Sequence, residues 1–106
     1  MNVLIGDIGN TVTKICLIES KNFKVKKISY FKSNKIPSKN FLRKKLLSIT
    51  KNKNINKFAL FSSVVPKYFK IFKKILKKKY GIKSREISEK KINKIITINL
   101  KNKEQV

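Results

Sequence analysis

The stretch NVLIGDIGNTVTKICLIE, residues 2–19, decides the fold expected for this chain. Its two halves, residues 2–8 and 11–19, are apolar runs with many β-branched residues, a composition typical of strands in a protein core. Gly9-Asn10 lies between them, and both residue types tolerate the positive φ of a tight two-residue turn. We therefore expect an antiparallel β-hairpin at the start of the chain.

The next two segments predict a third strand and a helix. FKVKKISYF, residues 23–31, alternates in two different phases, and a bulge near Lys26-Lys27 would join them. Ser38 can cap a helix over residues 39–51, because its hydroxyl can accept a hydrogen bond from the first turn. Apolar residues recur at helical spacing along one face of that helix, at Leu42, Leu46 and Ile49.

The second half of the chain predicts alternating strands and helices. KFALFSSVVP, residues 57–66, is a continuous apolar run stopped by Pro66, as expected for a central strand covered on both faces. Residues 67–81 predict a helix with one apolar stripe and a terminal glycine, followed by a short strand at residues 83–88. The stripe consists of Tyr68, Phe72, Ile75 and Leu76, and a last alternating run consists of Ile96, Ile98 and Leu100.

The expected order is three strands, a helix, a strand, a helix and a strand. Three meandering strands followed by such an alternation imply an α/β fold with a mixed sheet, an antiparallel edge, and helices on its faces. A length of 106 residues fits one domain with one core. The sequence shows no internal repeat and no linker, so we expect a single domain over residues 1–106.

The formal net charge of +23 is the most unusual bulk property. Clustered cations favour nucleic acid or an anionic membrane, because they release counterions when they bind phosphates. However, only Arg43 and Arg85 are arginine, the residue that makes bidentate contacts to phosphate and guanine. Lys, Ile and Asn are abundant throughout the chain. This uniformity indicates a background composition bias and argues against a specific nucleic-acid interface.

The remaining composition excludes several classes of site. Cys16 is the only cysteine and the chain has no histidine, so we expect neither an intrachain disulfide nor a His-based metal cluster. The first apolar run meets Asp7 too early for a signal peptide or a membrane span. These features predict a cytoplasmic protein without membrane association.

GDIGNTVTK, residues 6–14, contains the only aspartate, Asp7, beside the glycine turn. A hairpin tip of Gly9-Asn10-Thr11 would offer backbone N–H groups, an amide and a hydroxyl, with which proteins hold phosphate without a helix. Asp7 would bind Mg²⁺, which prefers oxygen ligands and is shared with substrate phosphates, and Lys14 would neutralise phosphate charge. The alternative interpretation is that Gly9-Asn10 is only a turn and Asp7 only a turn residue.

Two segments, IGDIGNT at residues 5–11 and FSSVVP at residues 61–66, together resemble the type III pantothenate kinase family, which includes the Bvg accessory factor proteins. The resemblance covers the whole chain. It implies a ribonuclease H-like half-domain of the superfamily of actin, heat-shock proteins and the acetate and sugar kinases. It also implies ATP-dependent phosphorylation of pantothenate, the first step of coenzyme A biosynthesis, with Mg²⁺, a monovalent cation (K⁺ or NH₄⁺) and a homodimer.

The resemblance also assigns site residues. It implies that Asp7 serves the metal and the phosphates, and that Lys14 is a charge partner. We interpret Ser62, Ser63 and Pro66 as the end of a central strand beside the cleft rather than as ligand contacts. The whole ATP-phosphate segment implied by the resemblance is Asp7, Ile8, Gly9, Asn10, Thr11, Val12, Thr13 and Lys14.

LKNKEQV, residues 100–106, resembles the segment that leads into the G-x-D-R motif of the family. Leu100 occupies the position of a substrate-site tyrosine, and Lys103 that of a proline. The catalytic base and the arginine of the motif would follow Val106, so we expect one N-terminal lobe here without the second lobe. Phosphoryl transfer requires donor and acceptor to be positioned together, and we therefore expect these 106 residues to be inactive alone.

Two other functions are consistent with the sequence. The chain could be a non-enzymatic basic module that binds nucleic acid or another polyanion through the lysine faces of its two helices. It could also be a nucleotide-binding relative from the same superfamily with a different acceptor.

Overall fold

The computed structural model describes residues 1–95, in which five strands form one mixed sheet in the order β3-β2-β1-β4-β5. β2 is antiparallel to β1 and β3, whereas β4 is parallel to β1 and β5. This confirms the predicted α/β class and the antiparallel edge, and the strand order fits the expected ribonuclease H-like half-domain. The strands are β1 (Asn2–Ile8), β2 (Val12–Glu19), β3 (Val25–Lys32), β4 (Ile55–Ser63) and β5 (Lys83–Glu86).

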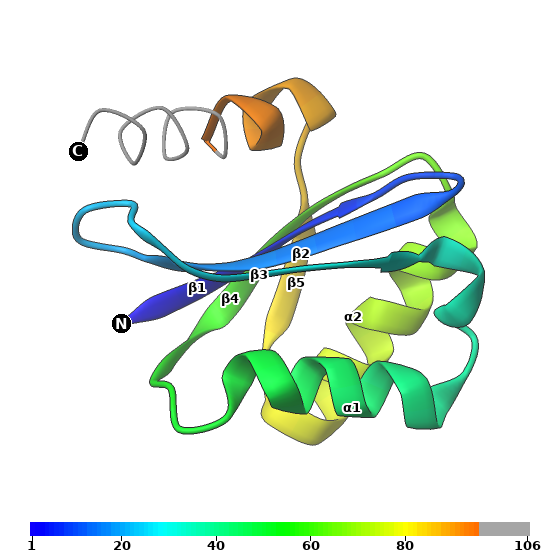
Figure 1. Cartoon of the computed structure of the whole chain (residues 1–106), viewed down its shortest axis with the longest axis horizontal. Coiled ribbons are helices and arrows are strands. Elements are labelled where there is room, and N and C mark those ends of the chain that lie inside the picture. The colour runs from blue at the N-terminus through cyan, green and yellow to red at the C-terminus, as the bar shows by residue number, and fades with distance from the viewer. Residues whose placement is uncertain (96–106) are drawn as a thin grey trace.

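Helices cover both faces of the sheet. A short 3₁₀ helix, η1 (Ser33–Lys35), leads into α1 (Lys39–Thr50), and α2 (Pro66–Tyr80) connects β4 to β5. α1 and α2 lie on one face, which we call the helix face, whereas a helix at residues 89–95 lies over the opposite face (Figure 1). Within residues 1–95, no helix combines the length and apolar composition needed to cross a membrane.

The helix ends form for the reasons that the sequence predicts. The Ser38 side chain accepts a hydrogen bond from the backbone N–H of Phe41, at 3.4 Å, and caps α1. Gly81 ends α2 in the left-handed conformation, with φ of 65°, and its N–H donates to the carbonyl of Lys77. β4 ends at Ser63, so Pro66 opens α2 at its first position rather than directly stopping the strand.

The third strand confirms the predicted bulge but is shorter than expected. The register of β2 with β3 shifts between Leu17, which pairs with Lys27, and Ile18, which pairs with Val25. Lys26 is thus the extra residue. Phe23 lies outside the strand at a φ of 57°, because the β2–β3 turn extends further than the residue pattern indicates.

The helix at residues 89–95 was not predicted. Its start is marked by Ser88, whose side chain accepts a hydrogen bond from the N–H of Lys91 at 3.3 Å. Ile92 is fully buried against the opposite face of the sheet. This burial stabilises the helix, although the apolar residues of the segment show only a weak helical spacing. The predicted alternating run from Ile96 to Leu100 lies outside the described residues.

Side chains of each strand alternate between two apolar layers. Between the sheet and α1 and α2, the core includes Leu4, Ile8, Phe61 and Phe72, all fully buried. The opposite face has a smaller buried cluster, consisting of Ile5, Cys16, Ile18 and Ile92. Burial raises the pKa of the Cys16 thiol to about 11, against a smaller opposing effect of Lys14, so this thiol is protonated at neutral pH.

The absence of a side chain at Gly6 of β1 leaves room for the ring of Phe61 on the neighbouring strand β4. A Cβ atom at Gly6 would lie 2.3 Å from the ring of Phe61, its register partner on β4. That ring is fully buried and packs against Phe69 and Phe72, with centroid distances of 5.9 and 5.1 Å. A side chain at Gly6 would therefore force the aromatic core to move.

We predict that Gly6→Ala destabilises the chain by about 1–3 kcal/mol, the usual cost of overpacking a core. Urea denaturation followed by circular dichroism measures this change. If the clash with Phe61 is the cause, Gly6→Ala should cost much less in a Phe61→Leu background, where the ring is absent. Equal costs in both backgrounds would contradict this explanation.

Candidate functional site

Asp7 lies in a polar row that crosses the face opposite α1 and α2. Its register partners are Lys14 on the antiparallel strand β2 and Ser62 on the parallel strand β4. Paired residues present their side chains to the same face of a sheet. Side chains alternate along a strand, and the next residue, Ile8, belongs to the core under α1 and α2, so Asp7 and its partners face the other way. Tyr30 of β3 pairs with Lys14 and extends the row. We call Tyr30, Lys14, Asp7 and Ser62 the polar row.

Ser62 fixes the carboxylate of Asp7. Its hydroxyl donates a hydrogen bond to Oδ1 of Asp7 at 2.7 Å, and Ser62 is only 2% exposed. Asp7 itself is half-buried, and no described residue donates a hydrogen bond to its Oδ2. One carboxylate oxygen is therefore positioned by the protein and the other is available to a ligand. Sequence reasoning treated Ser62 as structural, whereas the structure makes it a positioning residue for Asp7.

Lys14 lies beside Asp7 without forming a salt bridge to it. The ammonium group of Lys14 lies over the Tyr30 ring, 5.9 Å from its centroid, a position that favours a cation–π interaction. Within residues 1–95, the one salt bridge joins the N-terminal amine of Met1 to Glu19, at 3.1 Å. The Lys14 charge is therefore not neutralised by a described carboxylate and can interact with an anion.

The hairpin tip differs in detail from the predicted turn. Asn10 and Thr11 lie at its centre, because the N–H of Gly9 already donates to the Val12 carbonyl at 3.1 Å. Within the part of the chain that the structure describes, neither Gly9 nor Asn10 has a positive φ, so the expected primed turn is wrong. Gly9 is required instead for close packing, since a Cβ atom there would lie 2.7 Å from the Val12 carbonyl oxygen.

The backbone N–H groups of Asn10 and Thr11 are the ones that remain available at the tip. Both residues are exposed, and neither N–H is hydrogen-bonded to another described residue. Two adjacent unpaired N–H groups at a turn can donate to the same anion. The tip can thus offer the backbone N–H groups of Asn10 and Thr11 but not that of Gly9.

Buried hydrogen bonds from Ser33 hold the tip in place. The Ser33 hydroxyl donates to the Gly9 carbonyl at 2.6 Å, and its N–H donates to the Thr11 carbonyl at 2.9 Å. The Thr13 and Ser33 hydroxyls are 2.7 Å apart, and because Ser33 gives its single proton to Gly9, Thr13 must donate to Ser33. Thr13 and Ser33 are both fully buried. Sequence reasoning missed Ser33, which lies in the short 3₁₀ turn after β3 with no local motif.

A further contact holds the strand end behind the tip. The N–H of Val64, just after β4, donates to the Ile8 carbonyl at 3.1 Å. The Ser63 hydroxyl bonds to the backbone of Val65 and shapes the start of α2. Pro66 then begins the helix. Ser63, the last residue of β4, and Pro66, the first residue of α2, therefore shape the backbone of the β4–α2 connection.

The predicted segment from Asp7 to Lys14 divides between the two faces of the sheet. Asp7 and Lys14 lie on the opposite face, while the side chains of Ile8 and Thr13 are buried on the helix face and can shape the loop without touching a ligand there. The exposed members are Asn10, Thr11 and Val12. Leu100, the predicted substrate-site position, lies outside the described residues.

The donor set suits a shared Mg²⁺ ion rather than a resident metal. Residues 1–95 contain no cluster of three or more His, Cys, Asp or Glu side chains. Asp7 supplies one carboxylate, and Mg²⁺ is commonly bound by one or two carboxylates together with water and substrate phosphates. The residues present therefore fit an Mg²⁺ ion that arrives with a phosphorylated ligand.

Comparisons with known proteins identify the family that the chain resembles in sequence. The family model described as type III pantothenate kinase matches residues 3–106. A type III pantothenate kinase from Pelagibacter ubique (strain HTCC1062) is 46% identical over 103 residues, which are 96% of this chain and 40% of the relative. The chain thus spans well under half the length of this relative. A crystal structure of the Aquifex aeolicus member of the Ppx/GppA family matches with a TM-score of 0.42 and 15% identity, over 84% of this chain and 35% of that one.

We predict that Ser33→Ala destabilises the chain by about 1–3 kcal/mol, because it leaves the buried Thr13 hydroxyl and the Gly9 carbonyl without partners. Urea denaturation measures the change. The matched control is Ser48→Ala, an exposed position of α1 whose side chain makes no hydrogen bond to a described residue, and this variant should stay within about 0.5 kcal/mol of the original chain. Equal effects of the two substitutions would contradict the role of Ser33.

Proposed function

Because the chain belongs to the type III pantothenate kinase family, we propose that it forms the ATP-binding lobe of an enzyme that phosphorylates pantothenate, the first step of coenzyme A biosynthesis. The observation that supports this most strongly is the Asp7 carboxylate, held by Ser62 at 2.7 Å next to the unpaired Lys14. Both lie on the strands that carry the exposed hairpin tip. A carboxylate, a cation and backbone donors together suit a metal-bound phosphate chain.

Each residue of the site has a distinct proposed role. Oδ2 of Asp7 would hold Mg²⁺, directly or through water, while Ser62 keeps the carboxylate oriented. The N–H groups of Asn10 and Thr11 would donate to phosphate oxygens, and the Lys14 ammonium would balance their charge. Mg²⁺, when bound, neutralises charge that develops on the transferring phosphoryl group. The buried Ser33 contacts keep these groups in one arrangement, which reduces the cost of ordering them on binding.

The acceptor side of the reaction is proposed to come from outside this lobe. Phosphoryl transfer requires an acceptor and a base facing the donor, and the described residues offer no second carboxylate within the polar row. We therefore propose that residues 1–106 bind the nucleotide without transferring its phosphate. The family resemblance further suggests a cytoplasmic homodimer that uses K⁺ or NH₄⁺.

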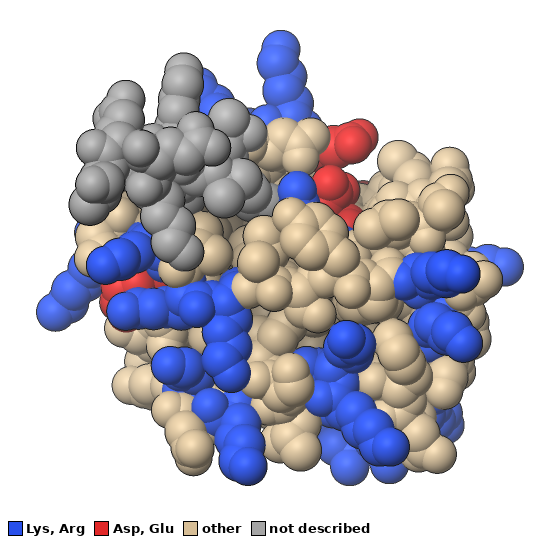
Figure 2. All heavy atoms as spheres, viewed as in Figure 1, with Lys and Arg blue, Asp and Glu red and all other residues tan. Residues whose placement is uncertain are grey.

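A second candidate function is binding of a polyanion through lysines. Figure 2 shows Lys and Arg side chains spread over the surface on the side of α1 and α2. A pocket of about 650 Å³ there is lined by basic residues around Ile71 and Ile75. Its basic residues are Lys39, Arg43, Lys74, Lys78 and Lys79. Such binding would weaken steeply with salt and would not depend on Asp7.

We predict that Asp7→Asn weakens Mg²⁺-dependent ATP binding about tenfold or more, since a contact to a charged group contributes about 1.5–3 kcal/mol. Isothermal titration calorimetry with ATP in Mg²⁺ and in EDTA measures the Mg²⁺-dependent part. Glu19→Gln is the matched control, because it removes the same charge from the far end of β2.

The kinase proposal requires that Glu19→Gln retain the affinity and that the effect of Asp7→Asn disappear in EDTA. Unchanged Mg²⁺-dependent binding in Asp7→Asn would contradict it. Binding that ignores Asp7 but is lost when the salt concentration is raised would support the polyanion function instead.

A further inference from the structure

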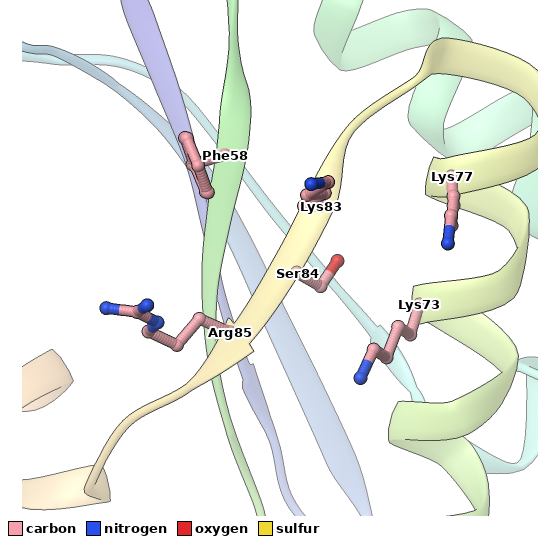
Figure 3. Close-up of a pocket in the computed structure, with 6 residues that line it drawn as sticks. All are labelled: Phe58, Lys73, Lys77, Lys83, Ser84 and Arg85. Carbon is pink, nitrogen blue, oxygen red and sulfur yellow. The ribbon is translucent and has the colours of Figure 1, made fainter.

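A small basic pocket lies between β5 and α2, away from the polar row. Its volume is about 260 Å³, somewhat below the ~300–1,000 Å³ of sites for drug-sized ligands. β5 is the edge strand of the sheet, and β4 separates it from the strand that carries Asp7. The lining residues are Phe58, Lys73, Lys77, Lys83, Ser84 and Arg85 (Figure 3).

Ser84 places an unpartnered hydroxyl in this pocket. The residue is only 8% exposed, and its Oγ atom is buried with no hydrogen-bond partner. In Figure 3 the hydroxyl points from β5 toward α2. A buried hydroxyl without a partner loses its hydration without compensation, and native proteins contain few such groups. The exception at Ser84 points to a ligand that accepts its hydrogen bond.

The charged residues around Ser84 indicate the charge of that ligand. Lys73 and Lys77 lie one turn apart on α2, an arrangement of like charges that is unfavourable in a helix. Lys83 and Arg85 flank Ser84 on β5, but because side chains alternate along a strand they belong to its other face, and in Figure 3 the Arg85 side chain extends away from α2. Within residues 1–95, no salt bridge neutralises these lysines. A ligand that satisfies both the hydroxyl and the lysines must be an anion.

We propose that this pocket binds a phosphate group, either as inorganic phosphate or as the end of a small phosphomonoester. A phosphate has several strong acceptor oxygens, so one group can accept from Ser84 and from the ammonium groups of Lys73 and Lys77 at once. The small volume suits such a group better than an extended polymer. This site does not use Asp7 or the hairpin tip, and it is therefore independent of the proposed nucleotide site.

Titration calorimetry with inorganic phosphate tests the proposal, with sodium chloride at matched ionic strength as the reference. The original chain should bind phosphate saturably at one site. Ser84→Ala and Lys73→Gln should each weaken that binding about tenfold or more, the value of one contact to a charged group. Lys44→Gln, which removes an exposed lysine of α1 that lines neither pocket, should stay within about twofold. Asp7→Asn should leave phosphate binding unchanged.

Thermal unfolding provides a second readout. Because the Ser84 hydroxyl has no protein partner, Ser84→Ala should leave the Tm unchanged or raise it in the absence of phosphate. A clear decrease would show that the hydroxyl has a structural partner and would overturn the proposal. Weak, non-saturating binding that is equal in every variant would overturn it as well.

A parallel titration with glycerol phosphate distinguishes the two sources of the group. Tighter binding of the ester identifies a phosphomonoester site, and tighter binding of inorganic phosphate identifies a site for the free ion.

Discussion

The position of Asp7 depends on one constraint, the registers in which β1 pairs with β2 and β4. These registers set Asp7 between Lys14 and Ser62 and set Gly6 against Phe61. A shift of one residue would exchange the two faces of β1 and move the carboxylate into the aromatic core. The fully buried Leu4 and Ile8 oppose such a shift, because they fit only the helix face. Packing on one face of β1 therefore determines the chemistry on the other.

A second level of order comes from buried hydroxyl groups. Ser62 orients the Asp7 carboxylate, and Ser33 holds the carbonyls of Gly9 and Thr11, so that the free N–H groups at the tip keep one direction. A loop fixed in this way does not have to be ordered by its ligand, which favours affinity. The proposed donor site is thus built from side chains of η1 and of the end of β4, as well as from the hairpin itself.

Local sequence patterns predicted the elements whose determinants are local. The Ser38 cap, the Gly81 stop, the β3 bulge and the opening hairpin each rest on a few adjacent residues. The features that were missed depend on distant contacts. Ser33 acts on Gly9, 24 residues away, and the helix at residues 89–95 is stabilised by burial of Ile92 against β-strands that precede it. The resemblance indicated Asp7 and Lys14, but only the sheet register shows that Ser62 belongs with them.

The central claim is that the hairpin tip and the polar row form the nucleotide site. Amide chemical shifts of the ¹⁵N-labelled chain, recorded while Mg·ATP is added at physiological salt, test it most directly. We predict that the first and largest changes occur in residues 9–14 and 62–65, which carry the tip, Lys14, Ser62 and the β4–α2 connection. Changes centred on the lysines of α1 and α2, with residues 9–14 unaffected, would contradict it.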